Sequence, residues 1–187
     1  MIAAGVKVNA KNIQGWTPLH AAVRWGTAEK IRLLLDAGAE VDSRTAKGWS
    51  PLHHAARHGT ATTVRQLLEA KANPNIANHN GWTVLHYAAR YGSAETVKLL
   101  LEAGADFEAQ TGVTGTGYTP LHLAAGNAEA ETVKTLIATG TDVDARDRDG
   151  WTPLYKASMS EDAEAAETAI RLLLEAGADP DASDKDK

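Results

Sequence analysis

The chain of 187 residues contains no cysteine, which excludes disulfides and thiolate metal sites and gives no support for export. It has no apolar run approaching the roughly 18 residues that a bilayer-spanning helix needs. Residues 1–10 carry one lysine and no long apolar segment, so no secretory signal is predicted. We therefore expect a cytoplasmic protein without membrane insertion.

An excess of positive charge is also lacking, because the formal net charge is −5. A protein that tracks nucleic-acid phosphates usually carries a basic footprint, so we predict no nucleic-acid partner. The acidity is concentrated beyond Gly140, where 13 Asp and Glu residues oppose 6 Lys and Arg residues. This pattern is typical of a solvated end of the molecule and less often of a docking patch for a basic partner.

A four-residue motif recurs along the chain and sets its organisation. Thr17-Pro18-Leu19-His20 returns as Ser-Pro-Leu-His at position 50, Thr-Val-Leu-His at 83, Thr-Pro-Leu-His at 119 and Thr-Pro-Leu-Tyr at 152, so the spacing is 33 residues except for one interval of 36. A period of this size indicates a solenoid, because each unit is too small to bury its own apolar face and must stack on its neighbours.

The period, the Thr-Pro-Leu-His motif and the downstream Ala-Ala, Leu-Leu-Leu and Gly-Ala-Asp segments resemble the ankyrin-repeat family from about Ala3 to about Ala182. The resemblance implies an all-α repeat solenoid of stacked helix-turn-helix units with β-hairpin fingers. The predicted boundaries are 1–14 for the tail of an incomplete N-terminal repeat, 15–47, 48–80, 81–116, 117–149 and 150–182 for repeats one to five, and 183–187 for a C-terminal tail.

The first full unit illustrates the expected local structure. Thr17 can cap a helix whose first position is Pro18, and Gly26 ends that helix. A second helix opens at Thr27 and carries an apolar stripe at i, i+3 and i+4. The equivalent stripes consist of Ile31/Leu34/Leu35, Val64/Leu67/Leu68, Val97/Leu100/Leu101, Val133/Leu136/Ile137 and Ile170/Leu173/Leu174. We assign these positions to the core.

The histidines of the motif are His20, His53, His86 and His122. They lie one repeat apart, too far to share a zinc ion, and no cysteine completes a ligand set. The resemblance implies that each histidine bonds to its Thr hydroxyl and to nearby backbone. We identify no nucleophile with a base, no paired carboxylates and no metal site, so we predict no catalytic residue, no cofactor and no enzyme activity.

Four departures from the repeat pattern stand out. The finger at 111–117 is three residues longer than the others and is a candidate contact loop. Repeat five has four extra residues around 159–165, which we expect to lengthen a helix or its connecting loop. Lys71 occupies a position held by glycine elsewhere, so we expect a positive φ there. The chain begins inside a repeat, which suggests either a piece of a longer array or a face that meets another chain.

The resemblance places partner contacts on the fingers and on the exposed side of the first helices, which together line a concave face. Aromatic residues follow the finger glycine in every repeat, and they either bind a partner or stiffen the fingers. The first helices add arginines and aromatics that suit carboxylates and extended peptides, although solvated side chains are an equal alternative. The predicted partner-binding residues are Trp16, Arg24, Trp25, Trp49, His54, Arg57, His58, Trp82, Tyr87, Arg90, Tyr91, Tyr118 and Trp151.

His54 and His58 are spaced i and i+4, but no third ligand is evident, so we expect surface histidines that titrate near neutrality. The predicted function is a non-enzymatic module that binds a protein or peptide on the concave face. The alternative is a structural or self-associating part of a longer ankyrin-repeat protein. We expect a monomer, with self-association through the first repeat as the other possibility.

Overall fold

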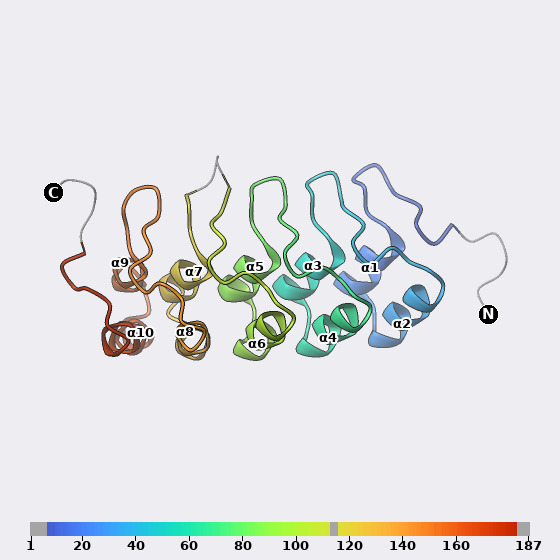
Figure 1. The fold of residues 1–187 in the computed structure, drawn as a ribbon. Helices are drawn as coiled ribbons and strands as arrows, with labels where there is room; N and C mark the ends of the chain where they lie inside the picture. Colours follow the sequence, from blue (N-terminus) through green and yellow to red (C-terminus); the bar gives the residue numbers. More distant parts are fainter. Residues whose placement is uncertain (1–6, 113–115, 183–187) are drawn as a thin grey trace.

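The computed structural model describes residues 7–112 and 116–182, and within these ranges the chain forms ten helices in five pairs (Figure 1). The expected centre of the long finger, the first six residues and the tail at 183–187 lie outside the described residues. The helices are α1 (Pro18–Trp25), α2 (Ala28–Asp36), α3 (Pro51–His58), α4 (Ala61–Glu69), α5 (Val84–Tyr91), α6 (Ala94–Glu102), α7 (Pro120–Gly126), α8 (Ala130–Ile137), α9 (Pro153–Ser158) and α10 (Ala163–Glu175).

The pairs stack side by side along one direction, with the first pair, α1 and α2, and the last pair, α9 and α10, at opposite ends of the stack (Figure 1). The first helix of each pair lies beside the fingers and the second helix lies on the far side, so the molecule has two helical layers (Figure 1). Each helix contacts its counterpart in the next repeat as well as its own partner. The predicted all-α repeat solenoid is confirmed.

The first helices begin as the motif predicts. In α3 the amide of His53 donates to the Ser50 hydroxyl, while the ring Nδ1 of His53 accepts from the Ser50 amide. This reciprocal cap satisfies donors that the first helical turn leaves open. The same arrangement occurs at Thr17, Thr83 and Thr119. The motif therefore caps the N-terminus of the first helix in each of these four repeats.

The core runs through the middle of the stack. The motif leucines Leu19, Leu52, Leu85 and Leu121 are fully buried. The second helices contribute the first stripe residue in repeats one to four, namely Ile31, Val64, Val97 and Val133. In repeat five Leu173 is buried instead of Ile170, and Leu174, which was predicted as core, is 44% exposed because no further repeat covers that side in the described residues. The alanine pairs Ala55/Ala56, Ala88/Ala89 and Ala124/Ala125 of the first helices are buried between repeats. Small side chains at these positions let neighbouring helices pack closely.

The motif histidines also join one repeat to the next. The Nε2 atom of His20 lies 3.1 Å from the carbonyl oxygen of Trp49, and the equivalent distances in the next three repeats are 3.1, 2.8 and 2.9 Å. Nδ1 of each ring contacts the motif hydroxyl. Burial lowers the pKa of His53 and His86 to about 4, so these rings are neutral at pH 7. The structural role implied by the family resemblance is thus observed.

The fingers are hairpin-shaped loops rather than ladders of strands. Among the described residues, the only bridge is the isolated antiparallel pair Ala77 and Thr83. Each finger is closed by a backbone bond such as Thr45 N–H to Trp49 O, and neighbouring tips are joined by one backbone bond such as Ala46 N–H to Gln14 O. These bonds hold the fingers in register along the stack.

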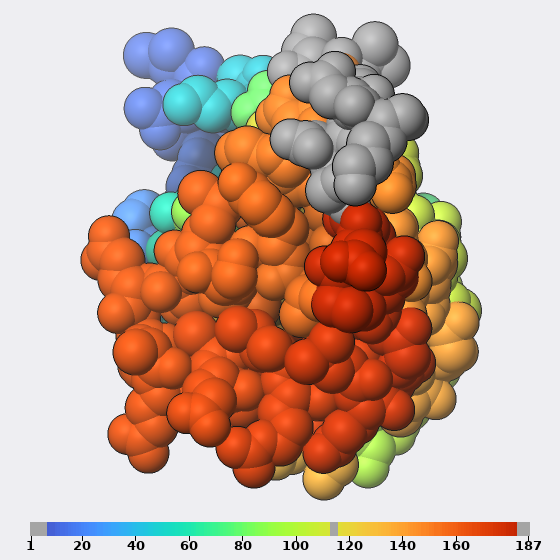
Figure 2. All heavy atoms as spheres, turned by 90° about the vertical axis from the view of Figure 1, so that its left-hand side faces the viewer, coloured from blue at the N-terminus to red at the C-terminus, as the bar shows by residue number. Residues whose placement is uncertain are grey.

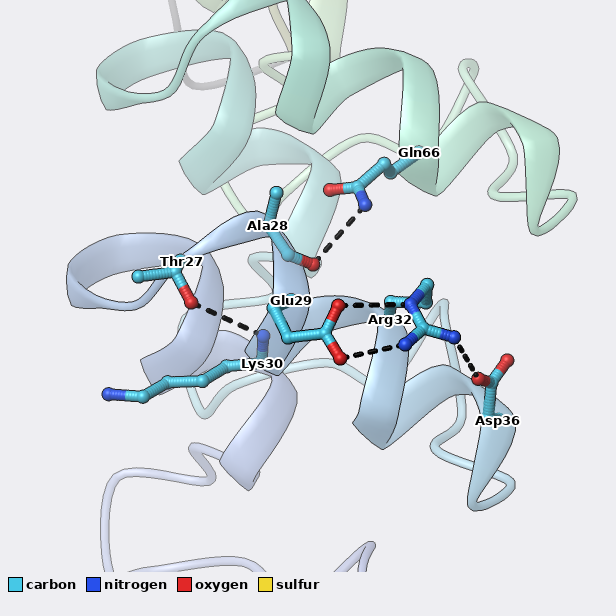
Figure 3. A network of polar contacts seen from close by, with 7 residues as sticks. All are labelled: Thr27, Ala28, Glu29, Lys30, Arg32, Asp36 and Gln66. Atoms are coloured by element: carbon cyan, nitrogen blue, oxygen red, sulfur yellow. Dashed lines mark hydrogen bonds and ion pairs between the residues drawn. The ribbon is translucent and has the colours of Figure 1, made fainter.

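Polar side chains link the outer layer of second helices (Figure 3). The Gln66 amide of α4 donates to the carbonyl of Ala28 on α2, across the repeat boundary. Within α2, Arg32 pairs with Glu29 at 2.7 Å and with Asp36 at 3.2 Å, and all three side chains are exposed. Exposed pairs of this kind contribute little free energy, so this surface is a solvated one.

The insert of repeat five lengthens its second helix. Helix α10 has 13 residues, whereas α2, α4 and α6 have nine each. Asp162 caps the extension by accepting from the amide of Ala165 at 3.1 Å. Figure 2 looks at this end of the molecule, where the atoms of the fifth repeat, in orange and red, form a broad exposed surface.

Candidate partner-binding face

The aromatic residues at the finger stems form one face together with the first helices. Trp16, Trp49, Trp82, Tyr118 and Trp151 are all partly buried, and each follows the last glycine of its finger. The backbone carbonyls of the last four accept the inter-repeat histidine bonds, which supports a role in fixing the fingers. Their rings remain partly accessible on the same face.

First-helix side chains fill the spaces between these stem aromatics. The His54 ring centroid lies 4.5 Å from that of Trp16 and 4.8 Å from that of Trp49. Tyr87 lies in the equivalent place, 4.4 Å from Trp49 and 5.0 Å from Trp82. We call these five residues the aromatic ladder. It is continuous across repeats one to three because each inserted ring touches the stems of two neighbouring repeats.

The prediction that His54 is a surface histidine that titrates near neutrality is wrong. The side chain is buried rather than on the surface, with 8% of the residue exposed, and neither ring nitrogen has a hydrogen-bond partner among the described residues. Burial lowers its pKa to about 3, so it does not titrate near neutrality. The spacing within α3 could not reveal this burial because Trp16, from the preceding repeat, covers the ring. His58 is exposed as expected, and partial burial lowers its pKa.

Two aromatic side chains project from the ladder into solvent. Trp25 is 70% exposed and stacks on Trp16 at 5.1 Å, and Tyr91 is 46% exposed and stacks on Tyr87 at 6.4 Å. Each is the last residue of its helix. Large exposed aromatic side chains beside partly buried ones are typical of the anchors of protein interfaces.

Arginines lie over the rings of the same face. The guanidinium carbon of Arg57 is 4.7 Å from the Tyr91 ring, 5.7 Å from Trp49 and 6.0 Å from Tyr87. Arg90 lies 5.2 Å from Tyr91. Arg24 lies 5.7 Å from Trp25. These cation–π contacts orient the guanidinium groups without occupying all of their hydrogen-bond donors.

Tyr118 and Trp151 belong to a separate cluster. The Lys156 ammonium lies 4.6 Å from the Tyr118 ring and 4.7 Å from the Trp151 ring, and it donates to the Tyr118 hydroxyl. Lys156 occupies the position in its repeat that His54 and Tyr87 occupy in theirs. This equivalence is the sequence signal that could have identified Lys156 as part of the site. In repeat four this position holds the buried Leu123, so the ring contacts are interrupted there.

A cavity of about 410 Å³ opens between the first two fingers. Its lining includes Ile13 at the first finger, Trp16, Trp49 and Lys47. Ile13 is fully exposed and was not selected from the sequence, where an isolated apolar residue carries no functional signal. The cavity gives the aromatic ladder an apolar recess at its N-terminal end.

The described part of the chain holds neither a metal-binding cluster nor a membrane-spanning helix. Residues 7–112 and 116–182 contain no group of three or more His, Cys, Asp or Glu side chains that could hold a metal ion. No described helix has both the length and the apolar character that crossing a bilayer requires.

Comparison with known families agrees with this architecture. A profile described as ankyrin repeats (3 copies) matches residues 38–111 and 108–184, and a profile for a single ankyrin repeat matches residues 14–46. The chain belongs to the ankyrin-repeat family. Ankyrin repeats are generally protein–protein interaction modules, and the family is typically non-enzymatic.

Short matches to curated proteins are also found. Protein phosphatase 1 regulatory subunit 12A from Mus musculus and from Rattus norvegicus is 56% identical to this ankyrin-repeat chain over 36 residues. The match covers 19% of this chain, about the length of one of its repeats, and 4% of each relative, so the chain spans only a small part of these much longer proteins.

Proposed function

We propose that this ankyrin-repeat protein is a non-enzymatic module in the cytoplasm that binds a protein or peptide on the concave face of fingers and first helices. The single observation that carries the proposal is the exposure of Trp25 and Tyr91 beside the aromatic ladder, with arginines over the rings. Aromatic side chains and arginine are the residue types enriched at energetically dominant interface positions.

The rigidity of the scaffold supports this proposal. The stem aromatics are held by backbone bonds to the histidines, and the fingers are bonded to one another, so little ordering is needed when a partner binds. A preorganised surface loses less conformational entropy on association than a mobile one. The phosphatase relatives carry the name of a regulatory subunit, which also fits a protein that acts by binding another protein.

The test is a quantitative pull-down from source lysate with the wild type and a Trp49→Ala, Arg57→Ala, Tyr91→Ala triple variant. We expect the variant to lose the partners that the wild type recovers. A matched control replaces three exposed lysines on the second helices, Lys30, Lys98 and Lys134, by alanine and should recover them normally. Equal recovery by the wild type and the ladder variant would rule out this face.

A second candidate function has its own observation. A hollow of about 490 Å³ lies on α1 and α2, on the side of repeat one that faces away from repeat two. Apolar side chains that line it include Trp25, Leu33 and Leu34. In repeats two to five the corresponding surface packs against the preceding repeat. An apolar surface of this shape on repeat one therefore favours self-association of the chain. Sedimentation at two protein concentrations distinguishes the candidates, because only the self-associating protein increases in mean mass with concentration.

A further inference from the structure

The cationic side chains of the candidate face have no acidic counterparts. No Asp or Glu occurs at positions 1–28, 43–68 or 70–94, which contain the first helices of repeats one to three and the finger segments that directly precede them. The same segments contain Lys11, Arg24, Lys47, Arg57 and Arg90. Around the ladder the local charge is thus positive, although the net charge of the whole chain is −5.

The structure confirms that these arginines are not neutralised within the described residues. The ion pairs there involve Arg32, Arg65 and Arg171, which lie on second helices. Arg24, Arg57 and Arg90 instead contact aromatic rings, and no described carboxylate lies within ion-pair distance of them. A guanidinium over a ring keeps its edge N–H groups available for a carboxylate, to which it can donate two parallel hydrogen bonds.

An apolar recess lies beside these cations. Trp49 lines the cavity between the first two fingers and also lies under the guanidinium of Arg57, so one indole belongs to both surfaces. A partner that places a large apolar side chain in the cavity therefore brings its adjacent residues toward Arg57. The cavity volume of about 410 Å³ is ample for one such side chain.

We propose that the partner is an acidic segment of another protein, in which Asp or Glu residues adjoin a large apolar residue. This inference rests on the proposed function. The carboxylates pair with Arg57 and Arg90, and the apolar side chain enters the cavity between the first two fingers. The acidic character of the partner gives the interaction its specificity, because a basic segment would meet unpaired like charges on this face.

The test begins with selection of binders from a random 12-residue peptide display library on the full chain. Affinities of selected peptides are then measured by fluorescence anisotropy for the wild type, an Arg57→Gln/Arg90→Gln variant and a Trp49→Ala variant. Arg65→Gln serves as the matched control, because Arg65 lies on α4 and pairs with Glu95. Circular dichroism and thermal melting check that each variant is folded.

We expect selected peptides to be enriched in Asp and Glu next to a large apolar residue. The double arginine variant should raise their Kd by about tenfold or more, as expected for the loss of charge-assisted hydrogen bonds. Peptides with Gln in place of Glu should lose affinity to a similar degree, and Arg65→Gln should leave Kd unchanged. Added salt should weaken binding.

Peptides without an acidic excess that still depend on Trp49 would overturn the inference and leave the proposed function standing. A selection that yields no Trp49-dependent peptide would contradict both. A single-stranded RNA 12-mer that binds more tightly than the peptides, and loses affinity in the double arginine variant, would overturn a protein partner in favour of a nucleic acid.

Discussion

Within residues 7–112 and 116–182, two residues other than glycine hold left-handed backbone conformations, Lys71 with φ of 67° and Ala128 with φ of 55°. Lys71 follows α4 at the position that Gly38 and Gly104 occupy after α2 and α6, where φ is 84° in both repeats. A residue with a Cβ is strained in this region, whereas glycine is not. The positive φ predicted for Lys71 from the repeat alignment is confirmed.

At the scale of this residue, we expect Lys71→Gly to raise the free energy of unfolding by about 1 kcal/mol, because the strain of a Cβ at positive φ is removed. The reverse change Gly104→Lys is the matched control and should lower it by a similar amount. A Cβ atom at Gly104 meets no atom within 4 Å, so the change tests the strain of the backbone rather than a clash of the Cβ. Urea unfolding gives both values, and an unchanged or lower midpoint for Lys71→Gly would contradict the prediction.

Among the ten helices of the described residues, α8 is the one whose start departs from the common pattern. The other nine have a side-chain cap from Ser, Thr or Asp, but Glu129 at the start of α8 makes no such bond. The preceding turn is also altered, since Ala128 takes positive φ in place of the Gly-Ser or Gly-Thr sequence used in repeats one to three. The first turn of α8 therefore has backbone N–H groups without a capping side chain.

At this scale we expect Glu129→Asp to stabilise the protein by about 0.5–1 kcal/mol by supplying the missing cap. Asp162 shows that an aspartate can cap a helix from this backbone conformation. It caps α10 with φ of −85° and ψ of 95°, close to the φ of −78° and ψ of 81° of Glu129. Removing an existing cap by Asp162→Ala is the control and should destabilise by about 1 kcal/mol. Thermal unfolding measures both changes. A Glu129→Asp variant no more stable than the wild type would show that the turn at Ala128 prevents capping.

The whole stack depends on neutral histidines at its repeat boundaries. Desolvation lowers the pKa of His54 to about 3 and of His53 and His86 to about 4, below the ordinary value of 6.5. Well above pH 6.5, the ordinary pKa of histidine, these sites carry almost no proton in either the folded or the unfolded state. As the pH falls further, the unfolded chain takes up protons that the folded chain does not, so stability is lost until the folded pKa is reached.

For the whole molecule we therefore expect stability to fall between about pH 6.5 and about pH 4.5, by about 1.4 kcal/mol per pH unit for each such histidine. His54→Leu should reduce this slope, because one of the depressed groups is removed. His58→Leu, at an exposed position on the same helix, is the control and should change the slope less. Urea unfolding across this window gives the slope. A stability that does not depend on pH there would show that the rings are accessible to protons.

The sequence by itself determined the architecture, because the period, the Thr-Pro-Leu-His caps and the leucine stripes are local patterns that repeat. It also placed Lys71 at positive φ and the stem aromatics on the finger side. Which of the aromatic and histidine side chains reach solvent was decided only by the tertiary structure. His54 is covered by Trp16 of the preceding repeat, and Arg57 contacts Tyr91 of the following repeat. Such contacts form when repeats stack, so no pattern within one repeat can reveal them.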